Sequence, residues 1–366
     1  KKKTRLVMDT GGSGRGKMLV SAETYESSVA KACLESGAAV INLTGPGESG
    51  EIYRMAAAHD AAVIICFVQG DNVRAVDDRD LSADPIPILT DYFEGEFGYR
   101  APIERVHHHD AHAASAYYAS GFDKAMILTV DGSGDGISTQ FTIGKEHNME
   151  VLERFERPNS LGIFYSMITQ YCGFRRDSDE YKLMGLSSYG DRTKYDFNDV
   201  IKFENNKIIL NTDYTKKITP KNPQPTRQEL IFEKKLIEKY GKKRFKNDEL
   251  TKHFKDVAAS AQAHVEDILI KMINYMYEKT GIKDLCMAGG VALNCTANQK
   301  IMNLDFIDRF YVQPASNDEG VAIGATYVVG RKHGLEIQTM DTVYLGPEYT
   351  NDEIKKFLDI LNVQYH

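Results

Sequence analysis

Apolar segments of strand length run directly into glycine-rich turns at two places in the sequence. Ala125–Val130 is followed by Asp131-Gly-Ser-Gly-Asp-Gly136, and Leu285–Met287 is followed by Ala288-Gly-Gly-Val-Ala-Leu-Asn294. Strands that end in such turns and open helices are typical of α/β folds, in which ligands bind at the carboxyl ends of the strands. The sequence therefore predicts an α/β fold with its ligand site at these strand ends.

The periodicity of the apolar residues predicts further elements. Residues 195–250 are rich in lysine and poor in apolar residues, which predicts an exposed insertion. Residues 137–143 alternate in polarity, and we expect them to pair back on 125–130 as a hairpin. Helices are expected at 22–36, 160–173, 256–279 and 322–329, and other strands at 61–68, 151–155 and 310–312.

Size and composition narrow the class of protein. A chain of 366 residues has the length of about two domains. It has no apolar run of the roughly 18–20 residues that a membrane span needs. A net charge of −7 argues against nucleic-acid affinity of the whole molecule, although a local basic patch stays possible. Five cysteines without a C-x-x-C pair predict the reduced thiols of a cytoplasmic protein.

Two histidines at helical spacing are the best candidate metal ligands. His108 and His112 lie four residues apart in an alanine-rich segment, so a helix would stack them on one face. Two imidazoles on one face can hold a single Zn, Fe, Mn-like or Cu ion. The alternative is an ordinary capped or solvated helix that happens to begin with histidines.

Each of the other polar motifs has a functional and a structural interpretation. The 131–136 turn can bring backbone N–H groups to phosphate and Asp131 to a metal, or it can be a plain hairpin turn. The glycines of 288–294 can clear space for a nucleotide at a helix N-terminus, or allow close helix–strand packing. Asp318 can complete a metal site, but helix capping is the favoured interpretation of its own segment.

Lysines near glycines raise the question of phosphate binding. Lys182, beside Glu180 and a glycine-bearing turn, can neutralise phosphate or simply be solvated. Gly11–Lys17 matches the P-loop pattern, but Met18 stands where Ser or Thr should hold Mg²⁺, so a flexible turn is favoured. Lys234–Lys246 is most simply a solvated helix face, with a phosphate-tracking patch as the alternative.

Taken in order, these segments resemble the O-carbamoyltransferase family of antibiotic and nodulation-factor biosynthesis. That family is related to the hydrogenase-maturation carbamoyltransferase and to the proteins that transfer threonylcarbamoyl to tRNA. The resemblance covers residues 105–350, and its ordered set of motifs is specific although no single motif is. The segments are 107–116, 128–136, 160–169, 180–190, 288–298, 314–325 and 344–354.

The resemblance implies an α/β fold of the actin/sugar-kinase/heat-shock ATPase type, with two RNase H-like halves and an interlobe cleft. Residues 1–122 would form an atypical N-terminal lobe that ends in the His-x-x-x-His helix. Residues 123–345 would form the second lobe, with the lysine-rich insertion at about 195–250. Residues 346–366 would begin a linker to a C-terminal domain that forms carbamoyl adenylate, which this chain lacks or another chain supplies.

The resemblance also implies a set of site residues. One divalent metal, iron by family precedent with Mn or Zn compatible, would be bound by His108, His112, Asp131 and Asp318. His59 would be an acceptor-side base and Lys182 a second catalytic group, although the interval from His59 to His108 is short for the family. The nucleotide would be lined by Gly132, Ser133, Gly134, Glu180, Lys182, Gly289, Gly290, Val291 and Asn294.

The function that follows is ATP-dependent O-carbamoyl transfer. Carbamoyl phosphate and ATP would give carbamoyl adenylate, and a hydroxyl of a small molecule or modified nucleotide would accept the carbamoyl group. The alternatives are a threonylcarbamoyl-type transferase acting on tRNA and a non-catalytic metal- and nucleotide-binding subunit. We expect a cytoplasmic protein without membrane contact, and nucleic acid is a partner that the acidic net charge does not favour.

Overall fold

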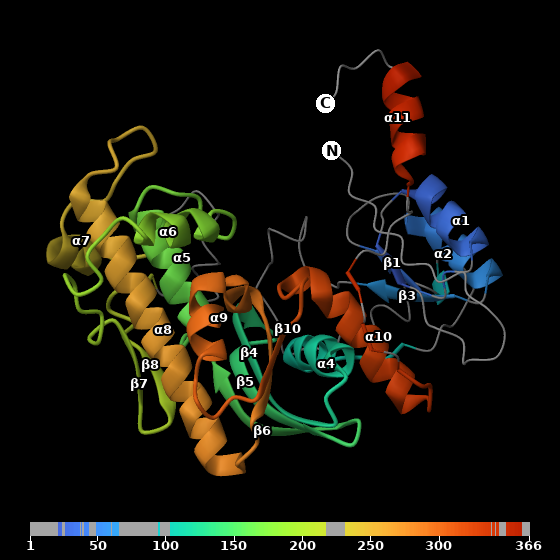
Figure 1. Cartoon of the computed structure of the whole chain (residues 1–366), viewed down its shortest axis with the longest axis horizontal. Coiled ribbons are helices and arrows are strands. Elements are labelled where there is room, and N and C mark those ends of the chain that lie inside the picture. Colours follow the sequence, from blue (N-terminus) through green and yellow to red (C-terminus); the bar gives the residue numbers. More distant parts are fainter. Residues whose placement is uncertain are drawn as a thin grey trace. The chain divides into compact units, whose positions relative to one another are not determined.

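The computed structural model of the chain divides into two compact units, which are described separately (Figure 1). The first comprises residues 1–65 and 342–366, and the second comprises residues 66–341. The residues that the structure describes are 103–216 and 231–337, with shorter pieces at 21–23, 26–36, 38, 40–43, 49–59, 61–65, 94–95, 339–340, 342–343 and 349–360. The Gly11–Lys17 motif lies outside them.

The first unit contains a small parallel sheet with helical crossovers. Strands β1 (Ser21–Glu23), β2 (Val40–Leu43) and β3 (Ala62–Ile65) lie in that order. Helices α1 (Ser27–Glu35) and α2 (Ser49–Ala58) connect them, as parallel pairing requires. Residues 351–360 form α11 (Asn351–Ile360), which buries no side chain. The core of this unit consists of Ala30, Cys33, Leu34, Ala38, Ile41 and Ile52.

The second unit is built on a five-stranded mixed sheet of order β10-β9-β4-β5-β6. The chain first forms an antiparallel meander and then adds two parallel strands beside β4. This confirms the expected α/β class, the hairpin of residues 137–143 and the third strand. The strands are β4 (Lys124–Gly134), β5 (Ile137–Lys145), β6 (Asn148–Glu156), β9 (Asp284–Ala288) and β10 (Arg309–Val312).

Helices cover both faces of this sheet (Figure 1). Because side chains alternate along a strand, Ala125 and Ile127 of β4 face α4 (His108–Ser120), while Met126 and Leu128 face the opposite core. That second core is formed largely by α5 (Leu161–Tyr171) and α8 (Lys252–Thr280). The remaining helices of this unit include α6 (Glu180–Ser187), α7 (Lys234–Tyr240), α9 (Cys295–Met302) and α10 (Val321–Lys332).

Small residues let α4 and α10 approach very closely. A Cβ added at Gly324 of α10 would lie 1.7 Å from the carbonyl oxygen of Ala111, so only glycine fits there. The alanines of α4 are buried, among them Ala113, Ala114 and Ala116. The alanine-rich composition of the histidine helix therefore reflects close packing on two sides, and the alternative of a solvated helix is wrong.

The expectation that residues 195–250 form an exposed insertion is wrong. They contain the hairpin β7 (Ile201–Glu204) and β8 (Lys207–Leu210) as well as α7, and they contribute side chains to the main core. Most of its described apolar residues point inward, although Ile209 and Phe245 are exposed, while the described lysines remain at or near the surface. The buried members are Phe197, Val200, Ile201, Ile208, Leu210, Tyr214, Ile231, Phe232, Leu236 and Tyr240.

The α7 part of Lys234–Lys246 has the ordinary form of a solvated helix face. Lys235 pairs with Asp213 at 2.9 Å, and Lys239 forms an ion pair with Asp199.

Of the described cysteines, three are buried and free, whereas Cys295 is exposed. None of the helices described combines the length and apolar character needed to cross a bilayer. The boundary predicted at residues 122 and 123 stays a prediction, although α4 packs on the sheet that follows it.

Truncation of Phe197 tests the core position of the lysine-rich segment. Phe197 is 1% exposed, so Phe197→Ala should lower the free energy of unfolding by about 3–5 kcal/mol. Phe245 of the same segment is 50% exposed, and Phe245→Ala should cost about 1 kcal/mol or less. Denaturant unfolding measures both, and equal small losses would show that the segment does not pack as described.

Candidate metal centre

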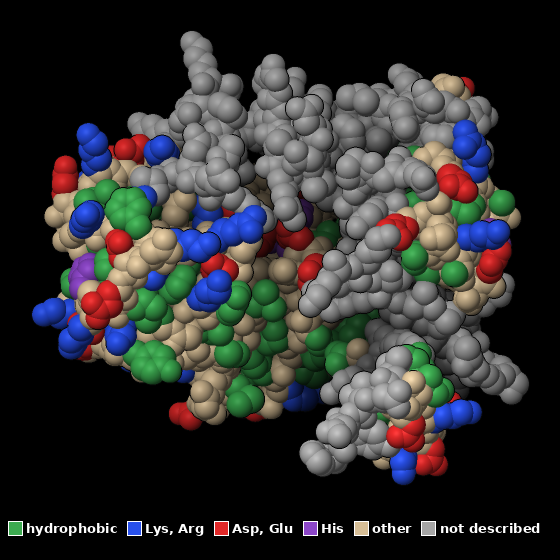
Figure 2. Space-filling model, turned by 90° about the horizontal axis from the view of Figure 1, so that it is seen from above, with side chains coloured by type: hydrophobic (Ala, Val, Ile, Leu, Met, Phe, Trp, Pro, Cys, Tyr) green, Lys and Arg blue, Asp and Glu red, His purple; other side chains and the backbone are tan. Residues whose placement is uncertain are grey.

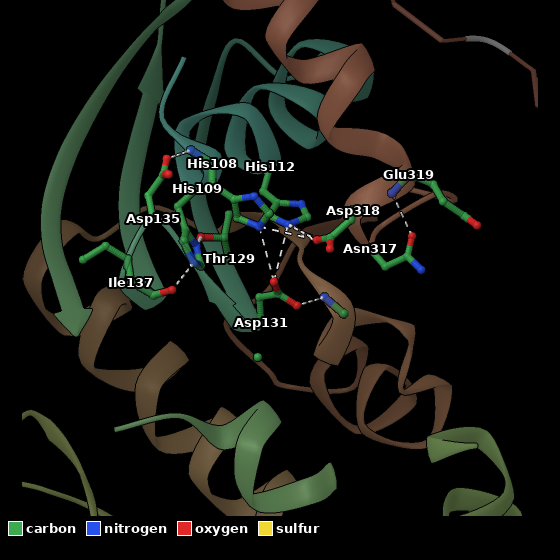
Figure 3. Close-up of polar contacts among 12 residues, drawn as sticks. His108, His109, His112, Thr129, Asp131, Asp135, Ile137, Asn317, Asp318 and Glu319 are labelled. Carbon is green, nitrogen blue, oxygen red and sulfur yellow. Dashed lines mark hydrogen bonds and ion pairs between the residues drawn. The ribbon is translucent and has the colours of Figure 1, made fainter. Parts of the chain in front are cut away.

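The first turn of α4 is held in place by neighbouring polar groups. His107 caps the helix by accepting a hydrogen bond from the backbone N–H of His109, and the Asp135 carboxylate accepts one from the backbone N–H of His108 at 2.9 Å. The helix then places His108 and His112 one turn apart, with ring centroids 4.6 Å apart. Both imidazoles therefore face the same space beside the sheet (Figure 3).

Asp131 reaches this space from the end of β4. One oxygen, Oδ1, accepts a hydrogen bond from the backbone N–H of Gly290 at 3.0 Å. The other, Oδ2, lies 3.3 Å from Nε2 of His108 and 4.0 Å from Nε2 of His112. The Ser160 hydroxyl donates to the carbonyls of Asp131 and Gly132, which fixes the backbone here. The carboxylate is thus oriented before any ligand binds.

Asp318 approaches from the opposite side, and its expected role as a helix cap is wrong. Asn317 is the cap, because its side chain accepts from the backbone N–H of Glu319 at 3.1 Å. The Asp318 carboxylate is left to point at the histidines, with Oδ1 3.4 Å from Nε2 of His108 and 3.6 Å from Nε2 of His112 (Figure 3). The structure therefore brings all four predicted ligand residues together.

The donor set fits one divalent ion. One ligand atom from each of His108, His112, Asp131 and Asp318 lies within 4.8 Å of the others. Metal–ligand bonds of about 2.0–2.2 Å place donors roughly 3–4 Å apart, close to the printed separations. Both ring nitrogens of His112 are buried without a hydrogen-bond partner among the described residues, and a bound ion would satisfy Nε2. Two imidazoles and two carboxylates suit Fe(II), Mn(II) or Zn(II).

Burial and neighbouring charges shift the pKa values of Asp131, His108 and His109 in different directions. Burial disfavours the charge of Asp131, but its hydrogen bond to His108 and the nearby imidazoles outweigh burial and lower its pKa. Burial likewise opposes the charge of His108, and Asp131 with Asp318 outweighs it, so the pKa of His108 is raised. Burial lowers the pKa of His109 to about 3. His109 is therefore a neutral, structural residue.

His109 anchors the helix to the sheet. Its ring contacts Thr129 Oγ1 at 2.7 Å and the Ile137 carbonyl at 3.0 Å, so it bridges α4 to β4 and β5. Sequence reasoning did not assign this role, although a residue next to His108 must point about 100° away from it on a helix. Asp135 was also missed as the partner of the His108 N–H. It lies in the turn between β4 and β5, 27 residues after His108, so no local sequence signal pointed to this contact.

Two of the predicted nucleotide glycines have direct steric roles. A Cβ at Gly134 would lie 2.0 Å from Cδ2 of His108, so glycine leaves room for that imidazole. Gly289 adopts φ 92°, and a Cβ there would lie 2.3 Å from the Val130 carbonyl oxygen. Close strand packing is therefore the role that the structure gives Gly289. Contact of either glycine with a nucleotide stays a prediction.

Five other residues predicted to line the nucleotide lie at the end of β4 or after β9 near this centre, and they differ in how far they are buried. Gly132 and Ser133 follow Asp131, and Gly290 and Val291 begin the short 3₁₀ helix η2 (Gly290–Leu293). Asn294 is buried, caps α9 through the Ala297 N–H and bonds to Gln262. Its amide is thus largely occupied inside the protein.

Three other predicted residues do not join the cluster of four. Glu180 accepts hydrogen bonds from the Ser166 hydroxyl and the Asp177 N–H, both at 2.7 Å. Lys182 pairs with Asp179 at 2.9 Å. His59 follows α2 in the first unit and is exposed. The structure tests neither the catalytic role of His59 nor that of Lys182.

The fold and the site define a mixed α/β protein with a His₂Asp₂ cluster at the ends of parallel strands. A family model described as the carbamoyltransferase N-terminus matches residues 86–327, which is more than half of the chain. The chain therefore belongs to the carbamoyltransferase N-terminal family. The match includes all four residues of the cluster and confirms the family predicted from the motifs.

Two curated relatives are longer than this chain. An uncharacterized protein of Synechocystis is 35% identical over 258 residues, covering 69% of this chain and 41% of that protein. Nodulation protein NolO of Bradyrhizobium diazoefficiens is 32% identical over 68% of this chain and 43% of its own length. The chain thus spans less than half the length of these relatives.

Solved structures with detectable similarity include HypF. Full-length HypF in its phosphate- and nucleotide-bound form covers 85% of this chain and 41% of its own, with 13% identity and a TM-score of 0.40. HypF of T. kodakarensis covers 78% of this chain and 44% of its own, with 15% identity and a TM-score of 0.38.

Adding one methyl group at Gly134 tests the geometry of the centre. Gly134→Ala should displace the His108 imidazole and weaken divalent-metal affinity by about 10–100-fold, the usual effect of disturbing a group that orients a ligand. Gly132→Ala is the matched control, because no atom lies within 4 Å of its Cβ position, and its metal affinity should be unchanged. Competition with a chromogenic chelator measures both, and equal affinities would contradict the described packing.

Proposed function

We propose that this chain is the metal-containing part of an ATP-dependent O-carbamoyltransferase. The observation that carries the proposal is the His₂Asp₂ cluster within a member of the carbamoyltransferase N-terminal family. In this proposal carbamoyl adenylate, made from carbamoyl phosphate and ATP, donates its carbamoyl group to a hydroxyl of a small molecule or modified nucleotide. The carbamoyl–oxygen bond to the acceptor forms as the bond to AMP breaks.

The proposed metal ligands are His108, His112, Asp131 and Asp318, with iron as the first candidate ion. When bound, the ion would supply Lewis-acid polarisation and a template for the reacting group. The chain itself orients the ligands: the Gly290 N–H holds Asp131, and His109 fixes the helix that carries both imidazoles. Such prior orientation avoids reorganisation at the moment of reaction.

The proposed nucleotide position lies beside Asp131, at the carboxyl ends of β4 and β9. These strands are parallel neighbours, and both run into glycine-rich segments, 132–136 and 289–290. Ligands of α/β sheets bind at such ends, where backbone N–H groups can face phosphate. The order β10-β9-β4-β5-β6 supports one RNase H-like half. A second half and the cleft between them belong to the proposal.

Other parts of the reaction are assigned outside the described centre. Because the chain spans less than half of its relatives, we assign formation of carbamoyl adenylate to a further domain or a separate chain. His59 is the proposed acceptor-side base, and a cytoplasmic location is proposed on cysteine content. Contact with a membrane is not part of the proposed function.

Removal of one imidazole tests the proposal. His108→Ala should lose the bound metal, and carbamoyl transfer from carbamoyl phosphate and ATP to a panel of hydroxyl acceptors should fall to background. His333→Ala is the control, because His333 is exposed and pairs with Glu104 away from the cluster. Elemental analysis and mass spectrometry of the acceptors measure the two effects. Full transfer by metal-free His108→Ala protein would reject the proposal.

The tRNA-directed alternative makes a different prediction. A threonylcarbamoyl-type transferase needs a basic RNA surface, whereas this chain has a net charge of −7. We therefore expect no specific tRNA band in a gel-shift titration at about 0.15 M salt. Salt-dependent tRNA binding would favour the alternative.

A non-catalytic subunit would bind metal and nucleotide but show no ATP turnover with carbamoyl phosphate, even when the adenylate-forming part is supplied.

A further inference from the structure

A cavity of about 860 Å³ lies at the C-terminal end of α5, apart from the metal centre. Ser160 holds the start of α5 on Asp131, and the cavity begins at Gly173, just after the helix ends. Eleven residues at 1.5 Å each make the helix about 16 Å long, so the cavity is roughly one helix length from Asp131. Its other lining residues are Phe174, Arg175, Asp179, Lys182, Arg244 and Lys246.

The most informative lining residue is a buried arginine. Arg244 is only 9% exposed, and its guanidinium donates to three backbone carbonyls, those of Asp248, Cys172 and Lys246, at 2.9–3.2 Å. No carboxylate lies within ion-pair distance of it among the residues that the structure describes. A guanidinium has five N–H donors, so two remain after these contacts. Buried charges are normally paired, which indicates that an anion belongs beside Arg244.

The rim of the cavity carries further positive charge. Within the described residues, the side chains of Arg175 and Lys246 form no ion pair, whereas Lys182 is paired with Asp179. Four cations and one carboxylate thus line the cavity, a net charge of +3. Lys and Arg side chains are numerous on the side of this unit that carries α6 and α7, interspersed with acids (Figure 2).

Gly173 and Phe174 line the cavity together with Arg244. Gly173 has φ 78°, and a Cβ there would lie 3.0 Å from Nη1 of Arg244. The nearest atom would be the Arg244 carbonyl oxygen at 2.9 Å, so glycine lets this turn pack closely against Arg244. The Phe174 ring lies 5.6 Å from the guanidinium carbon and adds an apolar surface to the same cavity.

We propose that this cavity is a second anion site, which binds the phosphate group of a small phosphorylated molecule. Guanidinium groups match the geometry of phosphate, and lysines add charge at the rim. The volume falls within the range of about 300–1,000 Å³ that small-molecule sites occupy. Phe174 would contact the organic part of the ligand. The inference is independent of the proposed metal, because none of its residues belongs to the His₂Asp₂ cluster; it shares only Lys182 with the residues predicted to line the nucleotide.

The test removes the two unpaired rim cations and spares the buried arginine. In Arg175→Ala/Lys246→Ala, the backbone carbonyl of Lys246 still accepts from Arg244, so folding should be preserved. Lys207→Ala/Lys271→Ala removes the same charge from exposed positions outside the cavity. Calorimetric titration with pyrophosphate and with AMP, in buffer with a chelator, measures binding. We expect at least about tenfold weaker binding in the first variant, as charge-assisted hydrogen bonds imply, and little change in the second.

The pattern of losses decides the outcome. Tighter binding of AMP than of pyrophosphate would support an organic phosphate as the ligand, and the reverse would contradict the assigned contact of Phe174 with an organic part. No stoichiometric binding by the wild-type protein, or equal weakening in both double variants, would overturn the proposal. So would equal weakening in His108→Ala, because it would place the anion at the metal centre.

Discussion

The carboxylate of Asp131 is the contact on which the site depends. One oxygen is bound by the backbone of Gly290, which follows β9, while the other faces the two imidazoles of α4. A single side chain thus joins the central strand, its parallel neighbour and the histidine helix. Because Oδ1 is bound by the Gly290 N–H, the carboxylate cannot rotate without losing that hydrogen bond.

Close packing supports this arrangement from both faces of the sheet. On one face, Gly324 lets α10 lie directly on α4, and the turn that carries Asp318 precedes α10. On the other, Ser160 ties the start of α5 to the backbone at Asp131. Helices packed this tightly move little relative to one another, so the spacing of the donors is set by the fold rather than by the ion.

The sequence predicted the strands and the pair His108 and His112 because both leave periodic or spaced signals, whereas Asp131 and Asp318 entered the predicted ligand set through the family resemblance. It failed where neighbouring residues compete for one role: Asn317 and Asp318 are both good caps, and only the backbone direction decides between them. It also failed for residues 195–250, because a count of apolar residues cannot show that Phe197 and Tyr240 point the same way. The role of Gly134 depends on a contact 26 residues away in sequence, which no local pattern reveals.

The side chains near the two ends of α5 carry charges of opposite sign. At its start, carboxylates outnumber fixed cations and favour a bound metal ion. At its end, a buried guanidinium is surrounded by carbonyls and rim cations, an environment that favours an anion. The two sites lie about 16 Å apart along a rigid, largely buried helix. A charge bound at either end is too distant to neutralise the other directly, so each site must be satisfied by its own ligand.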